Sequence, residues 1–334
     1  MLLRRTLPIL LLSIVSASAQ DLRVDVLDFY GLRKTSESQI RKTLGVREGD
    51  RLPPSKGDAE AKLDLLPGVV ESHLEAVCCD NGQTILYVGI EERGAPHFEL
   101  REPPEGEAVL PDEIISAYNR FLEAAQAASR RGSVEEDLTH GHPLMADASA
   151  RAIQEMFPAL ADTHLAQIRE VLRNSSDETQ RAMAAYVLVY ATRKTAIVDD
   201  LQYGLKDADA GVRNNAVRSL VALSVLAKLD PASGVHISPT WFIEMLNSLS
   251  WSDRNRALKA LQTLTDSRDP MVLDPLRTRA LDALIDMARW KTLSHALPAF
   301  ILLGRVAGMP EPEIQSAWTR GDHEAVIAAA KKSR

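Results

Sequence analysis

The sequence predicts a multi-domain protein, with a small α+β domain of element order β-α-α-β-β followed by an all-α solenoid of stacked helical repeats. Two segments, Arg-Asn-Asn-Ala-Val-Arg-Ser-Leu at 213–220 and Arg-Asn-Arg-Ala-Leu-Lys-Ala-Leu at 254–261, nearly repeat each other. Strand-like alternation and a hairpin signal are confined to the first 92 residues, and helical spacing follows. Stacked helical repeats bury their apolar faces against one another, and their extended surface usually holds another molecule.

The first 19 residues are typical of a secretory signal peptide. Arg4 and Arg5 precede an apolar run at 7–15, and Ala17-Ser18-Ala19 predicts cleavage before Gln20. The apolar run is too short to span a bilayer, and an uncleaved anchor is the alternative. We therefore expect a periplasmic or secreted protein without membrane insertion.

The charge balance argues against nucleic acid as a partner. The chain of 334 residues has a formal net charge of -7, and removing the two arginines of the signal peptide makes it more acidic. Non-specific binding to nucleic acid needs clustered cations, and docking to anionic lipid needs a basic surface. We expect protein partners and no nucleic acid.

The two cysteines, Cys78 and Cys79, are adjacent, so they do not form a framework of spaced disulfides. Neighbouring side chains on a strand point to opposite faces, which favours one buried and one exposed cysteine. A vicinal disulfide and an intermolecular bridge through one of the sulfurs are the alternatives.

The expected α+β domain covers residues 20–92. Apolar residues alternate with polar ones at Leu22, Val24 and Val26, which predicts a strand. Ser36 and Gln39 form a capping box for a helix that passes through Ile40 and Leu44 and stops at Gly45; a second helix is expected at 56–66.

Two further strands are expected at 69–79 and 84–91, joined by Asp80-Asn81-Gly82, which is a strong hairpin signal. The resulting sheet would have one face covered by the two helices.

This domain resembles a POTRA domain. The resemblance rests on Gly31 before the capped helix, Gly49-Asp50, the Leu63 to Val69 segment with its Pro67-Gly68, and the closing Ile90-Glu91. It implies a periplasmic domain that binds polypeptides, often by adding a strand to the edge of the sheet.

Residues 93–110 are rich in glycine, proline and glutamate and are expected to form a linker. From 111 to 334 the apolar spacing is helical, and no strand is expected after Ile90. Helices at about 111–131 and 311–332 would cap the repeats.

The repeat motif is an alanine with leucines at the following helical positions and an arginine three residues before it. Leu220 and Leu223 follow Ala216, and Leu261 and Leu264 follow Ala257. Ala184 and Ala280 begin weaker copies, and Ala280 is expected on the second helix of the repeat that Ala257 opens. Over residues 165–287 the pattern resembles HEAT-like repeats, including the short form found in bilin lyases.

Four arginines belong to this motif: Arg181, Arg213, Arg254 and Arg277. They could form a ridge that meets acidic ligands, but pairing with Asp or Glu within the array is favoured. Similarly, Trp241, Trp251, Trp290 and Trp318 could anchor a partner, but burial between repeats is favoured.

One loop carries a set of possible metal ligands, Asp137, His140, His142 and Asp147. A solvated loop with capping roles is the favoured interpretation, because no further ligand has a recognisable spacing. No nucleophile elbow, phosphate-binding loop or dinucleotide fingerprint is present in the sequence. The sequence therefore predicts no catalytic, cofactor-binding or metal-binding residue.

The combined expectation is an exported, non-enzymatic protein-binding scaffold or adaptor of the bacterial envelope. The alternative is an enzyme or ligand carrier that uses the concave face of the solenoid, as bilin lyases do.

Overall fold

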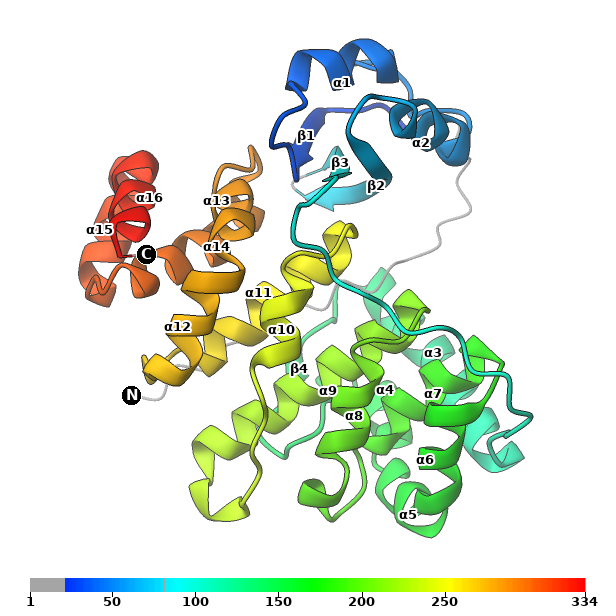
Figure 1. The fold of residues 1–334 in the computed structure, drawn as a ribbon. Helices are drawn as coiled ribbons and strands as arrows, with labels where there is room; N and C mark the ends of the chain where they lie inside the picture. Colours follow the sequence, from blue (N-terminus) through cyan, green and yellow to red (C-terminus); the bar gives the residue numbers. More distant parts are fainter. Residues whose placement is uncertain (1–21, 81, 334) are drawn as a thin grey trace. The chain divides into compact units, whose positions relative to one another are not determined.

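The computed structural model describes residues 22–80 and 82–333, which form two compact units (Figure 1). The described part of the first unit is residues 100–241, and the second unit joins residues 22–99 to the C-terminal residues from 242 onward. The structure therefore divides the chain differently from the expected scheme of a linker at 93–110 and one solenoid at 111–334. The expected signal peptide and its cleavage site before Gln20 lie outside the described residues.

The second unit contains the predicted α+β domain, with its elements in the expected order. The sheet has the strand order β1-β3-β2; β1 and β3 are parallel, and β2 and β3 are antiparallel. The elements are β1 (Val26–Tyr30), α1 (Glu37–Leu44), α2 (Lys56–Asp64), β2 (Val69–Asp80) and β3 (Gln83–Glu92).

Local signals determine where these elements begin and end. The Ser36 side chain accepts a hydrogen bond from the backbone N–H of Gln39, and Gly45 ends α1 with a φ of 67°. The first strand starts later than the alternation predicted, at Val26. The preceding segment pairs elsewhere, because Val24 donates to Asp50 and Leu52 donates to the carbonyl of Leu22.

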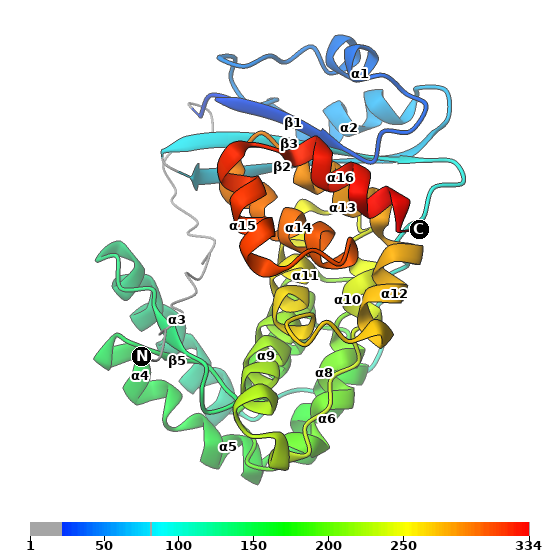
Figure 2. The ribbon, with the colours of Figure 1, turned by 90° about the vertical axis from the view of Figure 1, so that its left-hand side faces the viewer.

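Both faces of the sheet are covered. On one face, α1 and α2 contribute Ile40, Leu44 and Leu63 to a core that also contains Leu27 and Val88. On the other face, Tyr30 and Tyr87 pack against Trp251 and Trp290, with the Tyr87 and Trp290 ring centroids 5.1 Å apart. The expectation of helices on one face was therefore incomplete (Figure 2).

The second face is covered by helices of the C-terminal part of the chain, more than 150 residues further along the sequence. This part of the chain forms α11 (Trp251–Leu264), α12 (Pro270–Arg279), α13 (Leu281–Ala288), α14 (Leu293–Val306), α15 (Glu311–Arg320) and α16 (His323–Lys332). Of these, α11 and α14 contribute Trp251 and His295 to the packing against Tyr87, and α13 contacts β1. The expected single cap at 311–332 is thus two helices, and Gly321 ends the first of them in the left-handed conformation.

Polar contacts accompany this packing. The Glu75 carboxylate accepts hydrogen bonds from Ser250 Oγ at 3.1 Å and from the N–H of Ser252 at 3.2 Å. The N–H of Lys291 donates to Asp28 at 2.7 Å, and burial raises the pKa of Asp28 to about 6. These bonds fix the register between the sheet and the helices.

The first unit is mainly helical. A short antiparallel ladder of β4 (Glu136–Asp137) and β5 (Leu144–Met145) corrects the expectation of no strand after Ile90. The helices wholly within this unit are α3 (Asp112–Arg130), α4 (Ala148–Gln154), α5 (Phe157–Thr163), α6 (Leu165–Asn174), α7 (Glu178–Leu188), α8 (Val198–Gly204) and α9 (Ala210–Leu229). The short helix α10 (Thr240–Met245) begins at its end.

Two helix pairs, α6 with α7 and α8 with α9, lie next to each other in this unit. Helix α6 contacts α8, and α7 contacts α9. The small alanines of the motif, Ala184 and Ala216, are fully buried, and so is Leu188. Within residues 22–80 and 82–333, no helix is both long and apolar enough to span a membrane.

Candidate functional site

The segment expected to be a linker is fixed to the first unit by backbone hydrogen bonds. The N–H of Arg101 donates to Lys206 at 2.8 Å, that of Ser176 donates to Gly106 at 2.7 Å, and that of Leu110 donates to the Gln180 side chain at 2.6 Å. A Cβ atom at Gly106 would overlap the carbonyl oxygen of Asn174, so this close approach requires glycine. The connector therefore forms part of the first unit from residue 100 onward.

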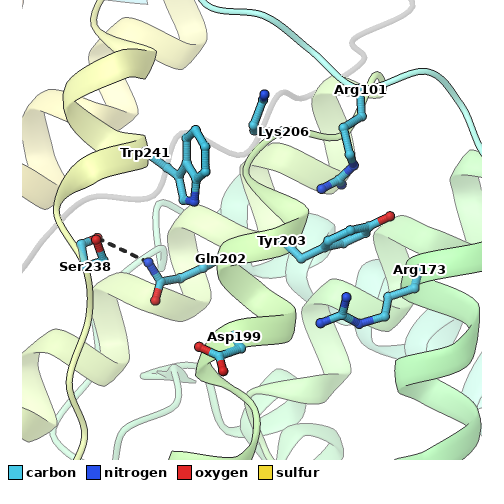
Figure 3. A pocket seen from close by; sticks show the side chains of 8 residues that line it. All are labelled: Arg101, Arg173, Asp199, Gln202, Tyr203, Lys206, Ser238 and Trp241. Carbon is cyan, nitrogen blue, oxygen red and sulfur yellow. Dashed lines mark hydrogen bonds between the residues drawn. The ribbon is translucent and has the colours of Figure 1, made fainter.

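The docked connector forms one wall of a cavity of about 400 Å³ in the first unit (Figure 3). Helix α8 and the turn after it provide the floor, the end of α6 provides Arg173, and the start of α10 provides Trp241. The cavity is lined by Arg101, Arg173, Asp199, Gln202, Tyr203, Lys206, Ser238 and Trp241.

Tyr203 lies between two guanidinium groups in this pocket. The Cζ atom of Arg101 is 3.3 Å from the centroid of the Tyr203 ring, and that of Arg173 is 4.4 Å away. Figure 3 shows the two arginines on either side of the ring. Lys206 lies 5.1 Å from the Trp241 ring, which adds a third cation held against an aromatic surface.

The three cations differ in how their charge is balanced. Arg173 pairs with the buried carboxylate of Asp200 at 2.6 Å, and Asp200 also pairs with Arg169 at 2.6 Å. Among the described residues, no carboxylate forms an ion pair with Arg101 or Lys206. Burial lowers the pKa of Arg101, and the neighbouring Arg173 lowers it further. An anion bound in this pocket would oppose both effects, because a nearby negative charge raises the pKa of a guanidinium group.

The pocket therefore suits a negatively charged group flanked by apolar or planar surface. Guanidinium groups bind carboxylates and phosphates with charge-assisted hydrogen bonds, which are stronger than neutral ones. The N–H donors of Arg101 and Lys206 make no hydrogen bond to a carboxylate in the described part of the chain and are available for such a ligand.

Three of the four motif arginines have a common structural role. Arg181 Nη1 donates to the carbonyl of Ser175 at 2.9 Å, Arg213 Nη1 to that of Asp207 at 2.8 Å, and Arg254 Nε to that of Ser248 at 2.5 Å. In each case the acceptor lies six residues earlier, in the loop before the helix. These side chains hold the loop against its helix and do not form a ligand-binding ridge.

Arg181 additionally connects the two helix pairs. Its Nε and Nη2 atoms both bind the Asp207 carboxylate at 2.9 Å, and the backbone carbonyl of Asp207 accepts from Arg213. The ion pair of Arg181 with Asp207 confirms the favoured expectation that a motif arginine pairs with an acidic residue.

Arg277 and Ala280 do not repeat the motif. Arg277 lies near the C-terminal end of α12, where it pairs with Asp274 at 2.5 Å, and Ala280 is the residue that precedes α13. The alanine of the expected fourth copy therefore lies between α12 and α13, and the sequence similarity there does not mark the first turn of a helix.

The candidate metal ligands are not brought together. Asp147 caps α4 and pairs with Arg131 at 2.6 Å, while His142 Nδ1 lies 3.2 Å from the ammonium of Lys194. Burial and Lys194 lower the pKa of His142 to about 4. Only His140 and Asp137 are close, at 3.5 Å, and no group of three such ligands occurs in the described ranges.

The tryptophans have different environments. Trp251 and Trp290 are buried against the sheet, so they pack between helices and strands and not between repeats. Trp318 is half-buried and stacks on His323, and Trp241 is half-buried in the pocket wall.

Cys78 is exposed and disulfide-bonded. This agrees with the alternatives that involve a disulfide. The side chain of Cys79 lies outside the described part of the structure.

Sequence reasoning missed the pocket residues. One signal was available, since Asp199, Gln202 and Tyr203 have the spacing of one helical face. Arg101 and Arg173 carry no such signal, because their approach to Tyr203 depends on how the connector and α6 pack against α8.

Comparisons with known proteins found no relative of this chain. No family model, no curated protein and no solved structure matches the chain.

Proposed function

We propose that this chain is an exported, non-enzymatic binding protein of the bacterial envelope whose first unit holds an anionic group of a protein partner. The observation that carries the proposal is the pocket in which Arg101, Arg173 and Lys206 surround Tyr203 and Trp241. The expectation of export rests on the N-terminal sequence alone, and the POTRA-like and HEAT-like resemblances support a role in binding polypeptides.

A protein segment suits the pocket better than an enclosed small molecule does. Most of the lining side chains carry a charged or polar group and Asp199 is exposed, so the site is partly open, whereas cofactor sites usually bury most of their ligand. Aromatic residues and arginine are enriched on surfaces that bind other proteins, and guanidinium groups pair with carboxylates of the partner.

The proposal is tested by calorimetric titration of the full chain with the acidic peptide acetyl-Glu-Glu-Glu-amide. We expect binding that weakens with salt, because exposed charges are screened. Arg101→Gln and Lys206→Gln should each lower the affinity about fivefold or more, since each removes a charge-assisted contact.

The matched control is Arg120→Gln, which removes an exposed arginine of the same unit outside the pocket. It should leave the affinity unchanged. Equal losses in Arg120→Gln and Arg101→Gln would show that net charge alone is responsible and would contradict the proposal. Citrate binding more tightly than the peptide would favour the alternative of a small-ligand carrier.

A further inference from the structure

Asp199 gives the pocket an acidic end that anion binding does not use. Its side chain is exposed and makes no hydrogen bond or ion pair within the described ranges. The neighbouring Asp200 already balances Arg169 and Arg173, so Asp199 is not needed to neutralise these arginines.

The acidic and basic ends of the pocket are separated along α8 and the turn that follows it. Asp199 lies in the first turn of α8, and Lys206 lies seven residues later in the turn after the helix, so at about 1.5 Å per residue the two lie about 10 Å apart along the axis. Figure 3 shows Asp199 at the lower end, Lys206 and Arg101 at the upper end, and Tyr203 between them. The pocket therefore has opposite charges at its two ends.

The polar groups between the ends strengthen this division. Gln202 Nε2 donates to the carbonyl of Ser238 at 3.3 Å, which leaves the Gln202 side-chain oxygen as an acceptor. Asp199 and Gln202 thus offer acceptors, whereas Arg101 and Lys206 offer donors.

We propose that the pocket recognises a polypeptide segment carrying a basic and an acidic side chain three residues apart, the basic one at Asp199 and the acidic one at Arg101 and Lys206. This inference rests on the proposed function, since it names the partner segment that the same pocket holds. In the polyproline II conformation, residues three apart lie on one face and are separated by about 9 Å. That distance matches the separation of the charged ends, and the aromatic wall of Tyr203 and Trp241 suits an extended segment of this kind.

The test compares two peptides, acetyl-Lys-Pro-Pro-Glu-amide and acetyl-Gln-Pro-Pro-Glu-amide, titrated into the full chain labelled with nitrogen-15. The indole N–H signal of Trp241 reports occupancy, and the buried Trp251 and Trp290 provide internal controls. We expect the lysine peptide to bind about threefold more tightly, because an exposed ion pair contributes this much in favourable geometry.

The variant Asp199→Asn should remove this preference and leave the affinity for the glutamine peptide unchanged. Glu123→Gln, which removes an exposed carboxylate on α3, should leave the preference intact. Arg101→Gln should lower the affinity for both peptides about equally, because both peptides carry the glutamate.

Two results would overturn the inference in different ways. If both peptides bind equally in the unmodified chain, and both depend on Arg101, then the acidic end has no role and only the anion-binding proposal stands. If neither peptide binds, or if binding is independent of Arg101, both proposals fail.

Discussion

At the scale of single residues, the motif arginines show how a repeated sequence becomes a repeated contact. Arg181, Arg213 and Arg254 each donate to a backbone carbonyl six residues earlier. A buried carbonyl without a donor would cost free energy, and the long arginine side chain reaches it from the first turn of the following helix. The conformation is local, which is why a short repeated segment encodes it.

Arg181 is expected to be essential for the stability of the first unit. Arg181→Met would leave the Asp207 carboxylate buried without its partner, so we expect the free energy of unfolding to fall by about 3–5 kcal/mol. Urea unfolding of the two proteins measures this difference. Arg151→Met, which breaks the half-exposed pair with Glu155, should cost less than about 1 kcal/mol. Similar losses in both variants would show that Asp207 is solvated.

At the scale of elements, the sequence was informative about helices and strands and uninformative about the connector. The cap at Ser36 and the stop at Gly45 are local signals, and α1 has the predicted bounds. The connector was expected to be a linker, because glycine and proline prevent regular structure. Glycine, however, also lacks the side chain that would prevent close approach, so Gly106 can lie directly against Asn174.

Gly106→Ala tests this close approach. The added Cβ would push the connector away from α6 and break the hydrogen bond from the Ser176 N–H to Gly106. We expect hydrogen exchange at the Ser176 amide to accelerate about tenfold or more, which corresponds to about 1.4 kcal/mol of lost protection. The control is Gly57→Ala, where the new Cβ meets no atom within 4 Å. Unchanged exchange at Ser176 in Gly106→Ala would show that the connector is not held there.

At the scale of the whole molecule, the second unit is built from the two ends of the described chain. The Tyr30, Tyr87, Trp251 and Trp290 side chains form one buried aromatic cluster between the sheet and the C-terminal helices. Because these residues share a core, the α+β domain and helices α11 to α14 should lose structure together.

Trp290→Ala examines this shared core. Removing the buried indole should cost about 3–5 kcal/mol, so hydrogen exchange should accelerate both in β3 and in α13 and α14. The first unit should keep its protection. Phe157→Ala, which removes a buried side chain of the first unit, should accelerate hydrogen exchange in that unit and leave exchange in β3, α13 and α14 unchanged. Faster exchange in the helices with unchanged exchange in β3 would contradict a shared core.

The sequence by itself determined local structure, namely the order of strands and helices in the α+β domain and the caps of α1. These features depend on residues a few positions apart. Only the tertiary structure decided that Trp251 and Trp290 cover the second face, and that Arg101 reaches Tyr203. An apolar stripe fits many apolar faces and a lone arginine fits many partners, so these pairings depend on how distant segments pack.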